Sequence, residues 1–216
     1  MSGFANALAS AAVVVTVAAV VALWRRRLRS ILLALVVQGV GLGAVATLLA
    51  VHERDAGLVV VAALVLGVKA VLIPALLARV ASASPDARES DPLVNVPASL
   101  VIAGLLTLVA FVAARPIVAI VGGPSGRLVP LGLATVLIGF FMMVARRRAL
   151  SQIVGLLLVD NGVALTAFLV TSGVPVIVEL GSSLDILFGV VVLRVLFARL
   201  SAIGVRDLDQ LASLHD

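Results

Sequence analysis

The chain has 216 residues, of which 62% are hydrophobic and 12% are charged, and its formal net charge at pH 7 is +5. A soluble domain carries about 25% charged residues, so this composition excludes a water-soluble enzyme and indicates a protein embedded in a lipid bilayer. The chain has no cysteine, which excludes disulfides and thiolate-bound metal centres. Its two histidines are widely separated in sequence, which argues against a histidine metal cluster, and we expect no cofactor.

Apolar segments long enough to span a membrane recur along the whole chain. Such a span needs about 20 mostly apolar residues. Read against the charges and helix breakers, the segments predict an all-α integral membrane protein with about seven transmembrane helices. The expected spans are Asn6–Trp24, Ile31–Val51, Leu58–Ala78, Val96–Ala114, Leu128–Ala145, Leu150–Val170 and Val176–Phe197.

The arginines between these spans predict their orientation, because short cytoplasmic loops carry an excess of Lys and Arg. If the run that begins at Arg25 is cytoplasmic, the run that begins at Arg146 is cytoplasmic too. The basic residues left outside are then Arg54, Arg115 and Arg127. This pattern needs an odd number of spans, so we expect the N-terminus outside and the C-terminus in the cytoplasm. Arginine clusters between apolar runs also indicate membrane topology rather than a nucleic-acid partner.

Two segments of the chain resemble each other. RRRLRSILLALVVQGVGLGAVATL begins at Arg25 and RRRALSQIVGLLLVDNGVALTAFL begins at Arg146; an ungapped alignment matches Ser30 with Ser151. Each segment follows one apolar helix and precedes another, so we expect two parallel three-helix repeats joined by one extra helix; chance similarity of apolar sequence is the alternative. The units are 1–81, the first three-helix unit; 82–127, a cytoplasmic loop, linking helix and outer loop; 128–203, the second three-helix unit; and 204–216, a cytoplasmic tail.

Several polar side chains fall inside the predicted spans, among them the single lysine of the chain. A charge at the bilayer centre costs about 2.5–3.5 kcal/mol on insertion scales, so such groups normally face other helices. Two interpretations stay open: the central groups belong to a proton or ion path, or Lys69 forms a structural ion pair with Asp160 or Asp185. The candidate path residues are Lys69, Asp160, Asp185, Glu179 and Gln38.

Three smaller features have structural interpretations. The alternating glycines Gly39, Gly41 and Gly43 predict a close approach between helices. Pro74 is expected to kink or end the third helix, because proline has no backbone N–H to donate. His52 is expected to lie on the surface.

Three stretches resemble component E of membrane-bound hydrogenase-4-type complexes. They are LGVKAVLIPALLARV, GLLLVDNGVALTAFLV and VPVIVELGSSLDILFGVVVLRVL. They match, in order, a K-A-x-L-I-P segment, an acid followed by Asn-Gly, and an E-L-G…x-D segment. The resemblance implies a non-catalytic membrane-arm subunit of a respiratory hydrogenase-like complex, with redox centres on partner chains and antiporter-like subunits that move protons or sodium.

The second unit is also similar to subunit K of bacterial complex I, which has a buried glutamate in each of its second and third helices. Asp185 matches the third-helix acid, whereas the second-helix position holds Leu157 and Asp160 lies one turn later. In the first unit, Lys69 takes the place of the third-helix acid, and Gln38 is the nearest polar group in the second helix. The first unit has therefore lost its central acids.

The sequence supports two other functions besides this one. The chain could be the small subunit of a multisubunit sodium/proton antiporter without a redox partner, since that subunit also looks like subunit K. It could instead be a purely structural membrane scaffold, in which polar residues serve helix assembly alone. In each case we expect a multi-pass protein of the bacterial or archaeal inner (plasma) membrane that contacts other membrane subunits and the lipid bilayer.

Overall fold

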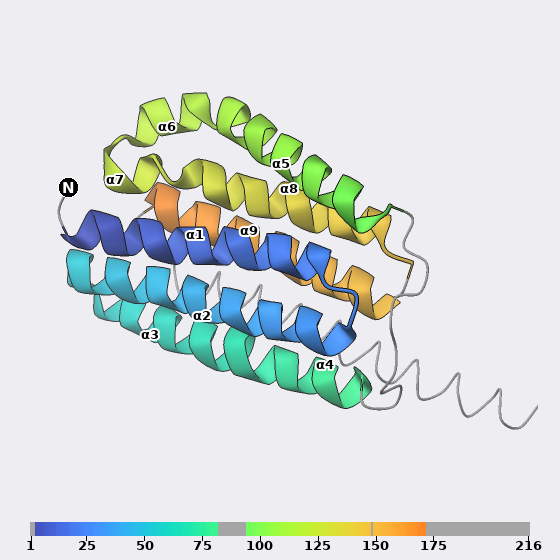
Figure 1. The fold of residues 1–216 in the computed structure, drawn as a ribbon. Helices are drawn as coiled ribbons and strands as arrows, with labels where there is room; N and C mark the ends of the chain where they lie inside the picture. Colours follow the sequence, from blue (N-terminus) through green and yellow to red (C-terminus); the bar gives the residue numbers. More distant parts are fainter. Residues whose placement is uncertain (1–2, 82–93, 148, 172–216) are drawn as a thin grey trace, which may run out of the picture.

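The computed structural model describes residues 3–81, 94–147 and 149–171. Every element in these residues is helical (Figure 1). The elements are α1 Gly3–Trp24, α2 Leu28–Glu53, α3 Ala56–Leu64, the π-helix η1 Val65–Leu72, α4 Ile73–Ala81, α5 Val96–Ala113, α6 Arg115–Val121, α7 Gly123–Gly126, α8 Val129–Ala145 and α9 Ala149–Thr171.

The described residues contain six helical stretches that are long and apolar enough to cross a membrane. They are Gly3–Trp24, Leu28–Glu53, Ala56–Arg79, Val96–Ala113, Gly123–Ala145 and Leu150–Thr171. They coincide with the first six expected spans, which confirms a multi-pass α-helical membrane protein. The seventh expected span, Val176–Phe197, lies outside the described residues.

The segment expected as an outer loop after the fourth span is largely helical. Residues Arg115–Val121 form α6 and Gly123–Gly126 form α7, each with a proline in its first turn, where the missing N–H costs nothing. Gly122 separates them with a φ of 63°, a conformation that favours glycine. The expectation of a loop was wrong here because RPIVAIV is apolar enough to continue the path of α5.

Pro74 does not end the third span. The chain becomes π-helical over Val65–Leu72 and returns to an α-helix at Ile73. At the end of η1 the N–H of Ile73 donates to the carbonyl of Val68, five residues back. The widened turns therefore lie just before the proline and let the helix continue past it.

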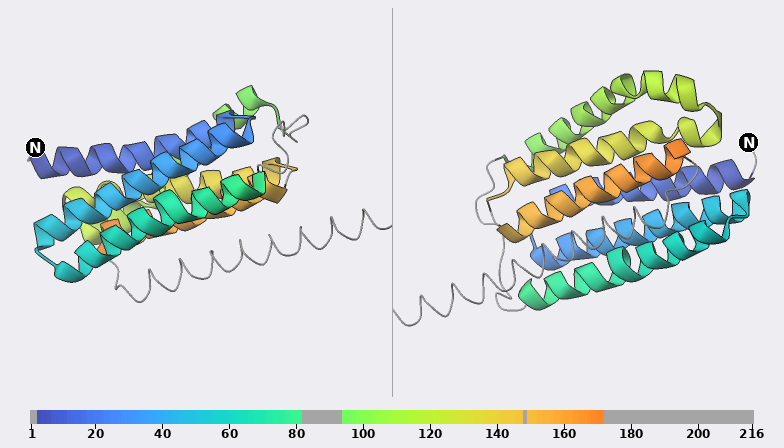
Figure 2. Two further views of the ribbon diagram at one scale, coloured as in Figure 1. Left: turned by 90° about the horizontal axis from the view of Figure 1, so that it is seen from below. Right: turned by 180° about the vertical axis from the view of Figure 1, so that it is seen from behind.

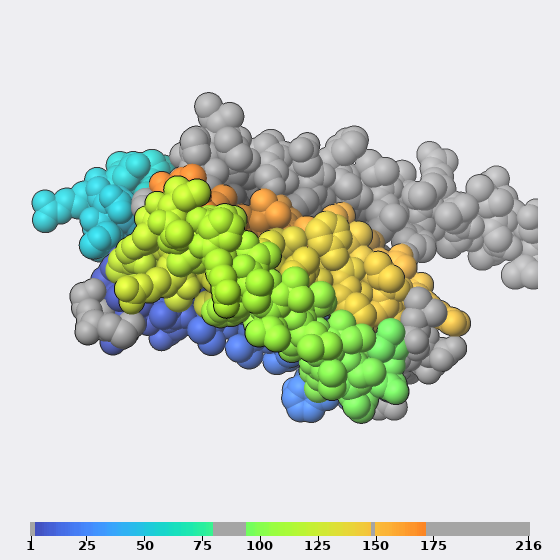
Figure 3. All heavy atoms as spheres, turned by 90° about the horizontal axis from the view of Figure 1, so that it is seen from above, coloured from blue at the N-terminus to red at the C-terminus, as the bar shows by residue number. Residues whose placement is uncertain are grey.

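The centre of the bundle is formed by α1, α2, α8 and α9 (Figures 1 and 2). α1 packs on α2 and α8, and α9 packs on α8 and α2. The span α3–η1–α4 lies on the outer side of α2, and α5 lies on the outer side of α8. Figure 3 shows α5 and α6 as a ridge on the surface beside α8.

The helices α1 and α2 run in the same direction as α8 and α9, respectively, beside which they lie. Near the middle of α1, Thr16 contacts Thr135 of α8, and at the end of α1 the side chain of Arg146 reaches the carbonyl of Arg25. The start of α2 likewise packs with the start of α9, and their ends pack together. This side-by-side, parallel placement is the arrangement that a parallel repeat requires.

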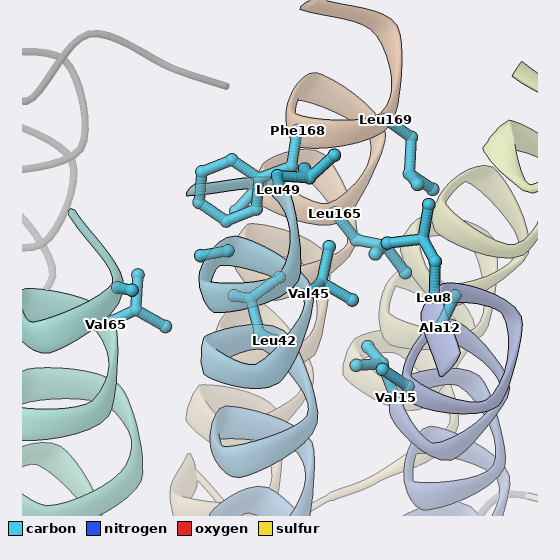
Figure 4. Packing of buried hydrophobic residues seen from close by; sticks show 14 of the residues in the cluster. Leu8, Ala12, Val15, Leu42, Val45, Leu49, Val65, Leu165, Phe168 and Leu169 are labelled. Atoms are coloured by element: carbon cyan, nitrogen blue, oxygen red, sulfur yellow. The ribbon is translucent and has the colours of Figure 1, made fainter. Parts of the chain in front are cut away.

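Two apolar clusters fill the bundle. One lies toward the end that carries the N-terminus and includes Leu8, Val45 and Phe168 (Figure 4). The other lies toward the arginine-rich end and includes Leu23 and Ile138. Without a hydrophobic driving force in lipid, such packing depends on close van der Waals contact.

The helices approach one another most closely at glycines, as the sequence predicted for α2. A Cβ at Gly39 would lie 2.8 Å from Cα of Ala70, and one at Gly41 would lie 2.9 Å from the side chain of Val15. α8 and α9 use the same device: a Cβ at Gly139 would lie 2.7 Å from the backbone N of Val159. Further glycines that pack in this way are Gly43, Gly132, Gly155 and Gly162.

Candidate functional site

A layer of polar side chains crosses the bundle between the two apolar clusters. Each of α1, α2, η1, α8 and α9 contributes to it near the middle of its span. In every one of these helices the polar residue is preceded by members of one apolar cluster and followed by members of the other. We call this set the mid-bundle polar layer; it consists of Thr16, Gln38, Lys69, Thr135, Asp160 and Asn161.

The charged part of the layer is an ion pair between η1 and α9. Lys69 Nζ lies 2.8 Å from Asp160 Oδ2, and the two side chains are 2% and 14% exposed, respectively. The pair is therefore almost completely removed from the surface, and Asp160 has the more exposed side chain of the two. An intramembrane ion pair of this kind marks a functional site more often than a surface pair does.

The π-helix and a glycine position Lys69. It lies within η1, and the backbone of the lysine and of Ala70 touches Gly39 of α2. A Cβ at Gly39 would lie 2.9 Å from the carbonyl carbon of Lys69, so only glycine permits this approach. Single π-helical turns inside α-helices occur frequently at functional sites.

The uncharged part of the layer connects α9, α2 and α1. Asn161 Nδ2 donates to Gln38 Oε1 at 2.8 Å, and Gln38 Nε2 donates to the carbonyl of Val15 at 3.2 Å. Both side chains are buried. Because Asn161 follows Asp160 in sequence, the amide pair lies directly beside the ion pair.

Two threonines extend the layer to α8. Thr135 Oγ1 donates to Thr16 Oγ1 at 3.2 Å, and Thr16 Oγ1 also lies 3.1 Å from the carbonyl of Leu131. Thr16 follows Val15, whose carbonyl accepts from Gln38. Polar groups thus occur in succession from α8 through α1, α2 and α9 to η1.

The structure brings together three of the five predicted site residues, Lys69, Asp160 and Gln38. Of the two acids considered as partners for the lysine, Asp160 is the one that the structure places against it. Asp185 and Glu179 lie outside the described residues. His52 is exposed, as expected, and stacks on Phe4 with ring centroids 3.9 Å apart.

The two threonines are not among the site residues that the sequence predicted. Each is a hydroxyl residue in the middle of an apolar span, which is a weak signal because threonines in helices usually bond to their own backbone. Here the carbonyl four residues back is an alternative acceptor for the single proton of each hydroxyl. The contact between the two hydroxyls depends on which faces of α1 and α8 meet. In the part of the chain that the structure describes, no three His, Asp or Glu side chains come together as a metal site would require.

The fold and the polar layer define a class of protein: a multi-pass α-helical membrane protein with an ion pair in its core. The chain belongs to the same family as the uncharacterized protein Rv0085 of Mycobacterium tuberculosis, to which it is 47% identical over 201 residues, 92% of this chain and 91% of that relative. No family model matches the chain, and no solved structure matches it.

Proposed function

We propose that this protein is a non-catalytic membrane-arm subunit of a hydrogenase-like, complex I-related assembly, and that its polar layer forms part of a proton or ion path. The observation that supports this most strongly is the ion pair of Lys69 and Asp160 at mid-depth. The arginine-rich end faces the cytoplasm in this proposal, and the spans lie in a bacterial or archaeal plasma membrane.

The energetics of the pair favour a functional role. Replacing a buried ion pair by apolar residues of similar volume is often neutral or stabilising. Packing alone therefore gives no reason to keep Lys69 and Asp160 in an otherwise apolar core. A group that must exchange a proton or repel a passing cation does give such a reason.

The positions of the stretches that resemble the hydrogenase-4 component also support the proposed function. Lys69 comes from the stretch that resembles the K-A-x-L-I-P segment, and Asp160 with Asn161 comes from the stretch that resembles the acid-Asn-Gly segment. These two stretches, distant in sequence, face each other in the core. Partner subunits would supply the redox chemistry and the antiporter-like channels, and this chain would link its polar layer to theirs.

One observation favours the scaffold alternative. Gln38 and Asn161 are hydrogen-bonded within the chain, and so are both threonines. A layer whose groups satisfy one another also fixes the register of the helices, as interhelical hydrogen bonds do in membrane proteins. The two functions differ in what happens when the charge is removed and the packing is kept.

The experiment begins with purification from native membranes in mild detergent and identification of the bound partners by mass spectrometry. The Asp160→Asn complex is then compared with wild type for proton and sodium movement into vesicles. We expect at least tenfold slower ion movement per assembled complex, because the amide keeps the shape of the side chain and loses its charge. The amount of assembled complex is measured alongside, because removing one member of the ion pair also destabilises the chain. The control Thr47→Val removes a hydroxyl that bonds to its own helix outside the layer and should change neither property.

Normal ion movement by a fully assembled Asp160→Asn complex would support the scaffold. A chain that purifies without any partner would contradict the proposal altogether. A sodium/proton antiporter subunit would be indicated by partners that include no redox protein.

A further inference from the structure

We propose that the turn between α1 and α2 is a binding surface for the phosphate groups of anionic phospholipids. We call it the arginine turn; its side chains are Arg25, Arg26, Arg27 and Arg29. All four are exposed. This inference does not depend on the proposed function, since it concerns one end of the bundle and not its middle.

A buried arginine from the other unit holds the turn in place. Arg146 is 3% exposed, and its Nη2 donates to the carbonyl of Leu23 and, at 3.2 Å, to the carbonyl of Arg25. Leu23 lies in the last turn of α1 and Arg25 directly follows the helix, where backbone acceptors lack helical partners and a positive charge is favoured. The contact orders the backbone of the turn without using the side chains of the arginine turn.

Charge at this end is unbalanced among the described residues. The acidic residues that the structure describes are Glu53, Asp55 and Asp160. The first two lie at the opposite end of α2, and the third lies in the mid-bundle polar layer. In addition, α2 begins without an acidic residue in its first turn or a side-chain cap, so its dipole adds to the positive field.

Trp24 places the turn at headgroup depth. This residue is 54% exposed at the end of an apolar span, and the guanidinium of Arg25 lies 5.5 Å from the centroid of its ring. Tryptophans gather at the membrane–water interface, where the indole is apolar on one side and polar on the other. The neighbouring arginines then lie where lipid phosphates lie, which favours a lipid over a soluble anion. Basic side chains near an anionic surface each add about a factor of five to binding, from about 1 kcal/mol per residue.

The test uses the purified full-length chain in neutral detergent, titrated with phosphatidylglycerol or phosphatidylcholine and read by native mass spectrometry. Wild type should retain phosphatidylglycerol in preference to phosphatidylcholine. The triple variant R25Q/R26Q/R27Q should bind phosphatidylglycerol at least tenfold more weakly, and R25K/R26K/R27K should keep most of the binding. Thermal unfolding of each variant checks the fold, which we expect to survive because Arg146 contacts backbone atoms.

The matched control removes three arginines from the other end of the bundle, as R54Q/R115Q/R127Q. We expect its phosphatidylglycerol binding to stay within about twofold of wild type, although its net charge falls by the same amount. Equal losses in the two triple variants would show a general charge effect and overturn the proposal. So would unchanged binding by R25Q/R26Q/R27Q, or displacement of the lipid by inorganic phosphate at equal concentration, which would indicate a soluble-anion site.

Discussion

At the scale of residues, the ion pair is the least expected feature of an otherwise apolar core. Lys69 and Asp160 are brought within 2.8 Å of each other in a described layer whose other side chains are uncharged. The effect of substitutions on stability is therefore asymmetric: removing one partner lowers the free energy of unfolding strongly, whereas replacing both by apolar residues lowers it little. This asymmetry gives a test of the pairing that does not depend on function.

We predict strong coupling between the two residues in a double-mutant cycle. Lys69→Met and Asp160→Leu should each destabilise the protein by about 3–5 kcal/mol, because each leaves one buried charge. The double variant should lie much closer to wild type. The measurement is the free energy of unfolding in detergent for all four proteins.

The same cycle on a pair outside the layer serves as its control. Thr47→Val and Thr107→Val remove hydroxyls that bond to their own helices on α2 and α5, so their effects should add. Additive effects for Lys69→Met and Asp160→Leu as well would show that the two side chains do not stabilise each other.

We predict a smaller coupling for the amide pair. Gln38→Leu leaves Asn161 Nδ2 without its acceptor and should cost about 1–3 kcal/mol. Asn161→Leu should have a similar effect, and the double variant should cost less than the sum. Unfolding measurements in the same detergent check this. A double variant whose loss of stability equals the sum of the two single losses would contradict the hydrogen bond between Gln38 and Asn161.

At the scale of elements, the π-helix explains how a span with a proline positions the lysine. If Ala56–Arg79 were a regular α-helix, the residues after Pro74 would face a different direction, relative to those before it, than they do in the structure. The sequence predicted an irregularity at the proline, but its form depends on the contact with α2. Gly39 allows that contact because it has no Cβ, and the backbone of η1 lies where a Cβ would otherwise be.

We predict that Gly39→Ala moves η1 away from α2 and weakens the ion pair. The new methyl group would meet backbone atoms of Ala70 at 2.8 Å, and backbone cannot move aside as a flexible side chain can. Gly104→Ala is the matched control, because a Cβ there meets nothing within 4 Å and alanine favours a helix. The midpoint temperature of thermal unfolding should fall for Gly39→Ala and should stay the same or rise for Gly104→Ala. Equal midpoint temperatures for the two variants would contradict the close approach of η1 to α2.

Helix positions were largely predictable, and helix connections less so. The first six spans follow from apolar length and charge, which are local properties of the chain. The helical character of 115–126 was missed because a short apolar stretch with prolines and glycines is compatible with either a loop or short helices. Its helices depend on Pro116 and Pro124 at their first turns and on the positive φ of Gly122.

At the scale of the whole molecule, the polar layer separates two apolar clusters in the bundle of described helices. The sequence predicted that Lys69, Asp160 and Gln38 lie near mid-depth, because depth follows from position within a span. It left open whether the lysine pairs with Asp160 or Asp185. Neighbours across a bundle depend on helix rotation and on glycine contacts such as those of α8 with α9, which no local pattern reveals.

We predict that the arginine-rich end is cytoplasmic. The native chain has no cysteine, so single cysteines report position cleanly. Glu53→Cys in intact cells should react with a membrane-impermeant maleimide, and Arg29→Cys should react only after the membrane is opened. The reverse labelling pattern would invert the topology and place the arginine turn outside.

The most direct test of the account is ion movement by complexes that carry Lys69→Met and Asp160→Leu together. The double replacement removes both charges and keeps an apolar core, so assembly with partners should be close to wild type. We expect proton or sodium movement into vesicles then to fall to the level of vesicles without the complex. Wild-type ion movement by the fully assembled double variant would contradict it.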